Sequence, residues 1–450
     1  MSTVFLQQLA LNQVTGALID ATSDRELLGG LNLRQVAATQ AMLAGGWILG
    51  QSPIAVMGDS IAAQNSNIVG GTYSTMARGP VSWMLSYLGH PWDFQPSDNF
   101  AVSETNLDAI IAAQLAPLLA AHATRRYTRC FISAGTNDTN GARTVAQIKI
   151  DFTTLFNALS SAGIRPVMTG IRPRGSDGAV TAAKRQNAQL NEWLYLLSLT
   201  GAIDYIPAGA EVYADNSTAF GNCLAALMYD SVLHPNTRGA ALEGRAMANY
   251  FIAKGVVPGI AFATQQSDSF ERTDNPAGVA FNAANPLLQG GTTTPTGMTV
   301  TGGTWSLGSR TLSNGQTRPV RSCALAASTL HHLYDDWTKT GAWLATDLQP
   351  GDIIEARASI VLTSAVAVNS VTIRLAEHDG NTSLSHYGLF SNESAVLSGN
   401  HTLYLRSPRI TVRSYFGSGN VNIFARVECQ TDGGASGTFD VHAFEVRKVA

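Results

Sequence analysis

The sequence predicts an α/β domain with a parallel sheet between two helical layers, followed by an antiparallel β-sandwich domain of the jelly-roll type. Between about residues 53 and 258, short apolar runs alternate with amphipathic stretches, which is typical of strands joined by helical crossovers. After Pro258, segments with a two-residue period are separated by Gly and Pro clusters, which is typical of antiparallel strands. A chain of 450 residues also exceeds what one ordinary core supports. We therefore expect domains at residues 46–258 and 259–450, preceded by a separate segment at residues 1–45.

The first segment, residues 1–45, has the apolar spacing of a helix. Leu27, Leu31 and Val36 recur among small and polar residues, so that one face is apolar. Such a helical segment either packs on the following domain or self-associates, and the sequence does not decide between the two.

In the α/β domain, strands are expected at the short apolar runs and helices between them. One helix is predicted from about residue 145 to 159, where apolar residues recur at spacings of three and four, and Gly163 can end it. The loops that follow parallel strands are where such folds carry their chemistry. The expected strands are Ile54–Met57, Arg129–Ser133, Pro166–Ile171 and Ala202–Ile206, and two further helices are expected at about residues 183–199 and 237–252.

In the C-terminal region, three segments show an alternation of apolar and polar residues. They lie at about residues 371–375, 421–428 and 439–444. Alternation of this kind places one face of each strand in a core and the other in solvent. The segments are therefore interpreted as strands of the sandwich.

Composition and charge exclude several classes of protein. The formal net charge is −3 and only 14% of residues are charged, so electrostatics give no case for nucleic acid or an anionic membrane as partner. No uncharged apolar run reaches the length that spans a bilayer, and the first residues lack the basic and apolar regions of a secretory signal. The location stays undetermined, and extracellular or virion-associated sites are both compatible with these features.

The four cysteines are scattered and show no Cys-x-x-Cys spacing. We expect buried free thiols and no metal site from them, although a disulfide between Cys323 and Cys429 is also compatible with the sequence. The cysteines are Cys130, Cys223, Cys323 and Cys429.

The first candidate for chemistry is Ser60, in the segment Met57-Gly-Asp-Ser60 directly after a predicted buried strand. A serine at the carboxyl end of a strand can present its hydroxyl to a cleft. Taken alone, Gly-Asp-Ser is also a common turn or helix cap.

The second candidate is Asn137, in the segment Gly135-Thr-Asn-Asp138 after the next predicted strand. Acyl transfer needs preorganised donors directed at the oxygen that becomes negative, and an asparagine amide can serve as one. An ordinary Asx-turn is the alternative interpretation.

The third candidate is the pair Asp230 and His234, in the segment Asp230-Ser-Val-Leu-His-Pro-Asn236 before a predicted helix. A histidine base removes the proton that keeps a serine hydroxyl a poor nucleophile. A nearby aspartate fixes the imidazole tautomer and stabilises the imidazolium. By itself His234 would be read as a surface residue that caps a helix.

Together the three segments resemble the nucleophile, Asn-bearing and Asp–His blocks of the SGNH (GDSL-like) hydrolase family, over about residues 50–255. The resemblance implies a flavodoxin-like α/β/α fold and ester hydrolysis without a cofactor. Ser60 would be the nucleophile, His234 the base and Asp230 its partner. The backbone N–H of Ser60 and the amide of Asn137 would belong to the oxyanion hole. Asp59 and Asp138 would anchor loops, and Arg78, Arg172 and Arg174 would either line the cleft or lie in solvent.

The sequence departs from the family in two places. The family's second block supplies a glycine whose N–H completes the oxyanion hole, but the segment at residues 99–105 contains none. The N–H of Ser103 or Glu104 would take that role, with Glu104 the preferred candidate. The family also places its aspartate three residues before the histidine, where this chain has Ser231. Asp230 lies four before, and without it the enzyme would use a Ser–His dyad.

Polar and aromatic residues cluster in the C-terminal region. His331-His332 and Asp335-Asp336 have the side chains of a metal site, but such a cluster is more often an ordinary loop, and we expect no metal. Tryptophan rings stack on sugar faces, so a glycan platform is a further hypothesis. Its candidate residues are Trp305, Trp337 and Trp343.

The arrangement of both domains resembles carbohydrate esterases and phage-associated proteins that process capsules. The expected function is therefore an O-acetylesterase acting on an acylated glycan. A general short-chain esterase or lipase is one alternative, and a catalytically weak glycan-binding virion protein is another. The sequence is also compatible with a homo-oligomer.

Overall fold

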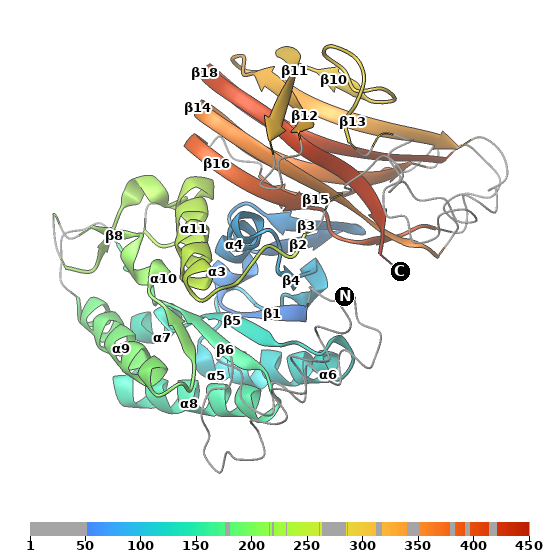
Figure 1. Ribbon diagram of the computed structural model, residues 1–450. Coiled ribbons are helices and arrows are strands. Elements are labelled where there is room, and N and C mark those ends of the chain that lie inside the picture. Colours follow the sequence, from blue (N-terminus) through green and yellow to red (C-terminus); the bar gives the residue numbers. More distant parts are fainter. Residues whose placement is uncertain are drawn as a thin grey trace, which may run out of the picture.

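The first described domain is a parallel five-stranded sheet covered by helices on both faces, which confirms the predicted α/β/α architecture (Figure 1). The computed structural model describes residues 52–141, 143–175, 181–215, 217, 220–230, 232–260, 262, 285, 287–311, 317–339, 351–378, 383–391, 397–413 and 421–449. The helical segment expected at residues 1–45 lies outside these ranges.

The strand order in this sheet is β4-β1-β5-β6-β7, and the neighbouring strands run parallel. Four of these strands lie where apolar runs predicted them, while the two-residue β4 was not predicted. The strands are β1 (Ser52–Gly58), β4 (Trp92–Asp93), β5 (Arg129–Ser133), β6 (Arg165–Thr169) and β7 (Asp204–Ile206).

Side chains of β1 alternate between two hydrophobic clusters, one on each face of the sheet. Ile54 and Val56 pack with one helical layer, while Ala55 and Met57 pack with the other. This alternation is why the strand is apolar at every position. The first layer contains α4 (Pro80–Leu88) and α11 (Thr237–Ala253), and the second contains α5 (Leu107–Ile110), α6 (Ala116–Arg125), α8 (Val145–Ser161) and α9 (Ala182–Leu199).

The helical stretch Leu107–Arg125 is long and apolar enough to cross a membrane by length and composition. This corrects the expectation that no segment approaches that length. Its residues Leu107, Ile110 and Leu118 are buried against the sheet, so one face of the stretch packs on the core of the first domain.

The second described domain is rich in antiparallel strands, as predicted. Two unusually long strands, β14 (Ile353–His378) and β18 (Val421–Lys448), pair with each other along their length. The segments at residues 421–428 and 439–444 are therefore parts of one strand. Register shifts of β14 against β18, between Thr363 and Ser370, bend the pair. The other strands are β10 (Thr299–Thr301), β11 (Thr304–Thr311), β12 (Thr317–Ala324), β13 (Leu330–Lys339), β15 (Ser383–Phe390), β16 (Leu397–Arg406) and β17 (Ile410–Thr411).

The two domains share strands and core. The hairpin of β2 (Ser66–Val69) and β3 (Thr72–Met76), which follows the first helix of the α/β domain, joins the C-terminal sheet because β3 runs parallel to β15. Trp83 on α4 and Ala240 on α11 belong to the same hydrophobic cluster as the C-terminal strands. The helices α4 and α11 therefore lie between the two sheets (Figure 1).

A buried ion network also joins the domains. Asp93 at the end of β4 lies 2.8 Å from Arg406 and 2.9 Å from Arg409 of the second domain, and 3.1 Å from Arg125 of the first. Burial raises the pKa of Asp93, but the three arginines outweigh this and lower it to about 2. The carboxylate is therefore charged at neutral pH and compensated from both sides.

Candidate active site

Ser60 is the first residue of the short helix α3 (Ser60–Ala63), at the carboxyl end of β1. Gly58 before it has a φ of +140°, and a Cβ at this position would lie 2.0 Å from the carbonyl oxygen of Ser133. Only glycine fits so close to the neighbouring strand. The glycine therefore permits the sharp turn that places Ser60 above the edge of the sheet.

Asp59 and Asp138 hold the loops of the first two motifs. The Asp59 carboxylate accepts a hydrogen bond from the N–H of Ile61 at 3.0 Å and caps α3. Burial raises the pKa of Asp59 to about 6. Asp138 accepts from the N–H of Leu107 at 3.1 Å and pairs with Arg143 at 2.6 Å. These contacts agree with the anchoring roles that the resemblance implied.

The structure brings Ser60, His234 and Asp230 into one chain of hydrogen bonds. The Oγ of Ser60 lies 2.7 Å from Nε2 of His234, and Nδ1 of His234 lies 2.5 Å from Oδ2 of Asp230. Because the ionised Asp230 only accepts, Nδ1 carries the imidazole proton and Nε2 is free to accept from Ser60. The extra residue between Asp230 and His234 does not separate them.

The other oxygen of Asp230 holds the loop itself. Its Oδ1 accepts from the N–H groups of Val232, Leu233 and His234, at 3.0, 2.8 and 3.0 Å. Partial burial raises the pKa of Asp230, but the hydrogen bonds to Leu233, His234 and Val232 lower it to about 2. Asp230 is therefore fully ionised at neutral pH.

Glu104 adopts a backbone conformation that favours glycine. Its φ is +66°, in the left-handed region, while its side chain is exposed. The segment around it is bound to the nucleophile turn, since the N–H of Val102 and the hydroxyl of Thr105 donate to the carbonyl of Gly58 at 3.2 and 3.3 Å. Glu104 therefore has the conformation that a glycine would supply in the family's second block.

Asn137 lies in α7 (Thr136–Asn140), whose N-cap Gly135 has a φ of +104°. Its side-chain amide donates to the carbonyl of Thr105 at 2.9 Å, which ties it to the segment that contains Glu104. An amide has a second N–H, so this contact orients the group without using all of its donors.

Gln114 is a supporting residue that the sequence did not indicate. Its amide donates to the carbonyl of Gly58 at 2.8 Å, and its oxygen accepts from the N–H of Gly58 at 3.0 Å. Gln114 is buried on the face of the helical stretch that also carries Ile110 and Leu118. A polar residue at an apolar position of an amphipathic helix was the available signal.

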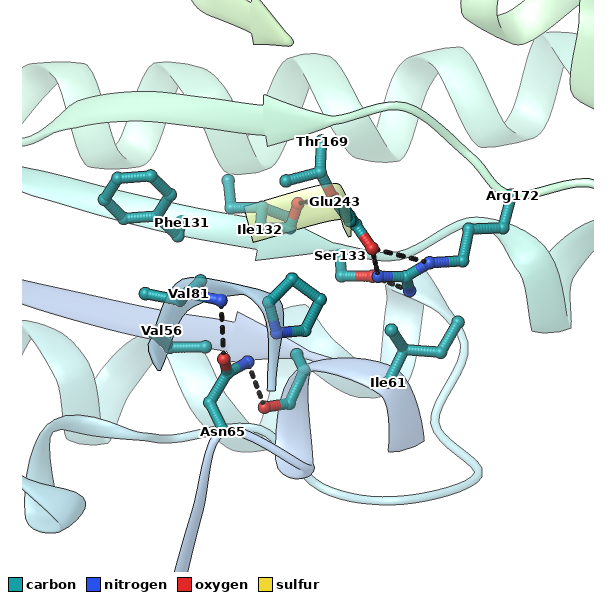
Figure 2. Close-up of a pocket in the computed structure, with 12 residues that line it drawn as sticks. Val56, Ile61, Asn65, Val81, Phe131, Ile132, Ser133, Thr169, Arg172 and Glu243 are labelled. Carbon is teal, nitrogen blue, oxygen red and sulfur yellow. Dashed lines mark hydrogen bonds and ion pairs between the residues drawn. The ribbon is translucent and has the colours of Figure 1, made fainter. Parts of the chain in front are cut away.

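A small pocket lies beside α3 and extends into the core (Figure 2). Arg172 and Glu243 form an ion pair at its wall, and Tyr213 donates to Glu243 at 2.9 Å. Arg172 is therefore a buried structural residue and neither a surface arginine nor part of an open cleft. The residues that line the pocket include Val56, Ile61, Asn65, Val81, Phe131, Ser133, Thr169, Arg172 and Glu243.

The prediction that Trp305 belongs to an exposed glycan platform is wrong. This tryptophan is 5% exposed, donates from Nε1 to the carbonyl of Gly302 at 2.7 Å, and packs edge-on against Phe439. It is a core residue because its apolar ring fills the space between strands. Trp337 lies in β13, but its side chain is outside the described part of the structure, and Trp343 lies outside it entirely.

The adjacent histidines His331 and His332 contact different groups. Nδ1 of His331 lies 3.4 Å from the buried thiol of Cys323, while Nε2 of His332 lies 2.6 Å from the hydroxyl of Thr301. Within the described ranges, no group of three or more His, Cys, Asp or Glu side chains is placed to hold a metal ion. All four cysteines are buried free thiols, as expected, so Cys323 and Cys429 form no disulfide.

Residues 56–242 match the model of the GDSL-like Lipase/Acylhydrolase family. The first domain is a GDSL-like lipase/acylhydrolase domain. This acylhydrolase domain contains the nucleophile turn, Asn137 and the Asp230–His234 loop, so its family is one of ester-hydrolysing enzymes.

Solved structures similar to the acylhydrolase domain include two named enzymes. A carbohydrate esterase family 3 protein from Talaromyces cellulolyticus is 18% identical, over 45% of this chain and 97% of that one, with a TM-score of 0.34. A GDSL-like lipase from Bacteroides thetaiotaomicron is 12% identical, over 50% of this chain and 97% of that one, with a TM-score of 0.32. No curated protein matches the sequence.

Proposed function

We propose that the chain is a serine esterase that removes short acyl groups, in particular O-acetyl groups of a polysaccharide. The observation that carries the proposal is the continuous contact from Ser60 through His234 to Asp230, at 2.7 and 2.5 Å. A serine, a histidine and an ionised aspartate in this order are sufficient for acyl transfer without a cofactor.

In the first half of the reaction, Oγ of Ser60 attacks the ester carbonyl carbon while Nε2 of His234 takes the hydroxyl proton. The imidazolium that forms is stabilised by Asp230, whose pKa of about 2 keeps it charged. The tetrahedral intermediate collapses when His234 returns the proton to the leaving sugar oxygen. Ser60 is then acylated and the deacylated sugar is free.

The negative oxygen of the intermediate needs donors that are already in place. The backbone N–H groups of Ser60 and Glu104 and the amide of Asn137 are the proposed donors. The contacts of Asn137 with Thr105, and of Val102 with Gly58, support this proposal because they bring the three segments together. Preorganised donors of this kind are each worth about 10²–10³ in turnover.

In the second half, water attacks the acyl carbon of Ser60 while His234 again removes the proton. The second tetrahedral intermediate then expels Oγ of Ser60, which His234 protonates, and acetate leaves. The two halves restore the enzyme with no net change in its protonation.

The preference for a short acyl group is supported by the surroundings of Ser60. The pocket beside α3 is lined by Ile61 and Ala62 but not by Ser60 or His234, and a buried ion pair stands at its wall, so it does not extend the site of the nucleophile into a tunnel for a long acyl chain (Figure 2). Val102 and Val232, on loops beside the nucleophile turn and His234, are 49% and 40% exposed and provide a small apolar rim. A polysaccharide substrate is supported by the β-rich second domain that packs on the acylhydrolase domain.

The test is hydrolysis of p-nitrophenyl acetate and butyrate by the wild type, Ser60→Ala and the control Ser198→Ala, with acetate release from acetylated polysaccharides. Ser198 is half-buried on α9 and its hydroxyl donates to the carbonyl of Tyr195, so its variant controls for loss of a serine hydroxyl elsewhere in the domain. We expect activity that prefers acetyl, survives in the control and is lost in Ser60→Ala.

Equal rates with acetate and butyrate, and no release from polysaccharide, would favour a general short-chain esterase. Absence of activity in the wild type, together with no labelling of Ser60 by a fluorophosphonate, would contradict the proposal and favour a glycan-binding protein.

A further inference from the structure

The loop that carries Asp230 and His234 touches a segment that the second domain holds in place. The guanidinium carbon of Arg78 lies 3.8 Å from the ring centre of Tyr229, the residue before Asp230. The N–H of Tyr229 donates to the carbonyl of His234 at 2.7 Å, which closes the loop. A change in the position of Tyr229 is therefore transmitted to both ends of the Asp–His pair.

Arg78 is itself positioned by strand β15 of the second domain. The N–H of Ala77 donates to the carbonyl of Phe390 at 2.8 Å, and the N–H of Leu389 donates to the hydroxyl of Thr75 at 3.0 Å. These bonds continue the parallel pairing of β3 with β15 to within one residue of Arg78. The end of β15 thus fixes the backbone from which Arg78 reaches Tyr229.

A second contact from the same end of β15 reaches the other side of the loop. The hydroxyl of Ser391 lies 3.1 Å from the hydroxyl of Thr237, the first residue of α11. Thr237 is 1% exposed and lies three residues after His234. The segment from Tyr229 to Thr237 is therefore contacted near both of its ends by elements that β15 holds.

We propose that the end of β15 is a positioning element of the active site, acting on the Asp230–His234 loop through Arg78 and Ser391. This inference rests on the proposed esterase function of Ser60. It makes the second domain part of the catalytic unit, in addition to any role in binding substrate. Arg78 and Ser391 touch no reacting atom, and they act through Tyr229 and Thr237.

The exposure of the loop explains why it needs such support. The side chains of His234 and Asp230 are 28% and 29% exposed, and Tyr229 is 60% exposed. The ring of Tyr229 therefore gains little from the hydrophobic core, and its guanidinium partner contributes to its position. A displacement of about 1 Å in the base can lower turnover by as much as about 10²-fold.

The test compares Arg78→Met, Arg78→Lys, Ser391→Ala and Ser391→Thr in the full chain, with p-nitrophenyl acetate as substrate. Matched controls are Arg426→Met, which removes an arginine stacked 5.0 Å from Tyr334 in the second domain, and Ser306→Ala, which removes an exposed hydroxyl there. Thermal melting and the rate of Ser60 labelling by a fluorophosphonate are measured for each variant.

We expect Arg78→Met to lower both kcat and the labelling rate by about tenfold, and Ser391→Ala to lower both by about threefold. In each variant KM should change by less than about twofold. Arg78→Lys and Ser391→Thr should recover much of the loss, because each keeps the interacting group. Both controls should retain wild-type kcat.

The inference is overturned if Arg78→Met and Ser391→Ala have the kcat and labelling rate of the wild type. It is also overturned if kcat falls in proportion to the melting temperature in these variants and in the controls alike, because the loss would then reflect stability. A change in KM without a change in kcat would overturn it as well. If the wild type itself shows no Ser60-dependent activity or labelling, the proposed function fails, and that outcome is distinct from the others.

Discussion

The side chain of Gln114 forms two hydrogen bonds to the backbone of Gly58, at 3.0 Å to its N–H and 2.8 Å to its carbonyl. Gly58 lies two residues before Ser60, so this amide fixes the turn that presents the nucleophile. The carbonyl of Gly58 has further donors in Val102 and Thr105, whereas Gln114 is the acceptor found for its N–H.

Replacing Gln114 with leucine should therefore destabilise the turn and slow the reaction. A buried N–H left without an acceptor costs about 1–3 kcal/mol. We expect the melting temperature to fall by several degrees and kcat to fall by about tenfold. Gln189→Leu, at an exposed position of α9, is the matched control and should change neither. Unchanged melting and kcat in Gln114→Leu would show that Gly58 keeps its conformation without the amide.

Glu104 combines a left-handed backbone with a negative charge beside the proposed oxyanion hole. A non-glycine residue in this conformation costs about 1 kcal/mol, and a carboxylate opposes the developing negative charge. We expect Glu104→Gly and Glu104→Gln to raise kcat by about two- to fivefold, and Glu104→Val to lower it by tenfold or more, since a branched side chain disfavours this conformation. Glu192→Gln, at an exposed position of α9, is the control for loss of a carboxylate.

The result with valine is the decisive part of this comparison. If Glu104→Val keeps wild-type kcat while melting at the same temperature, the backbone of residue 104 does not contribute to the oxyanion hole. The N–H of Ser103 would then be the donor to examine.

The buried pair Arg172 and Glu243 should respond differently to single and double replacement. Glu243→Met leaves a buried guanidinium without its carboxylate, Arg172→Met leaves a buried carboxylate without its guanidinium, and loss of one partner of a buried pair costs about 3–5 kcal/mol. Replacing both residues with methionine should be much less damaging than the sum of the two single changes. Denaturant unfolding of the wild type, the two single variants and the double variant measures this coupling. Additive losses would mean that the two residues stabilise the fold independently.

The sequence predicted the parallel strands well because each is buried on both faces and is apolar throughout. It did not predict β4, because a strand of two residues, Trp92 and Asp93, is too short to show a hydrophobic pattern. Residues 433–437 include three glycines, which are unfavourable in strands, whereas β18 passes through them with shifts of register against β14. Here the pairing with a long neighbouring strand outweighs local propensity.

The candidate site was predicted where its residues are close in sequence to a strand end or a helix start. Ser60, Asn137 and His234 all have this relation. The contacts of Arg78 with Tyr229 and of Ser391 with Thr237 join residues more than 150 positions apart, and no local pattern indicates them. The buried position of Trp305 was missed because a tryptophan can stack on a sugar or fill a core, and alternation alone does not distinguish these.

The interface between the domains should lose stability in mild acid because of His90. Its Nε2–H donates to the carbonyl of Tyr404 at 2.9 Å, and burial, with Arg406 nearby, lowers its pKa to about 3. Below the ordinary pKa of about 6.5, the unfolded chain binds a proton that the folded chain does not. The contribution of neutral His90 to the free energy of unfolding is therefore fully present above pH 6.5. It declines by as much as about 1.4 kcal/mol per pH unit as the pH falls towards 3.

Asp59 acts in the opposite direction, since its raised pKa of about 6 lets the folded chain bind a proton first. The effect of His90 is therefore measured as a difference between two proteins. Asparagine suits the test because it keeps a donor and tolerates the φ of +47° at this position. We expect His90→Asn to melt below the wild type at pH 7.5 but to lose less stability between pH 6.5 and 4.5. Parallel curves over that range would show that His90 does not titrate as its burial implies.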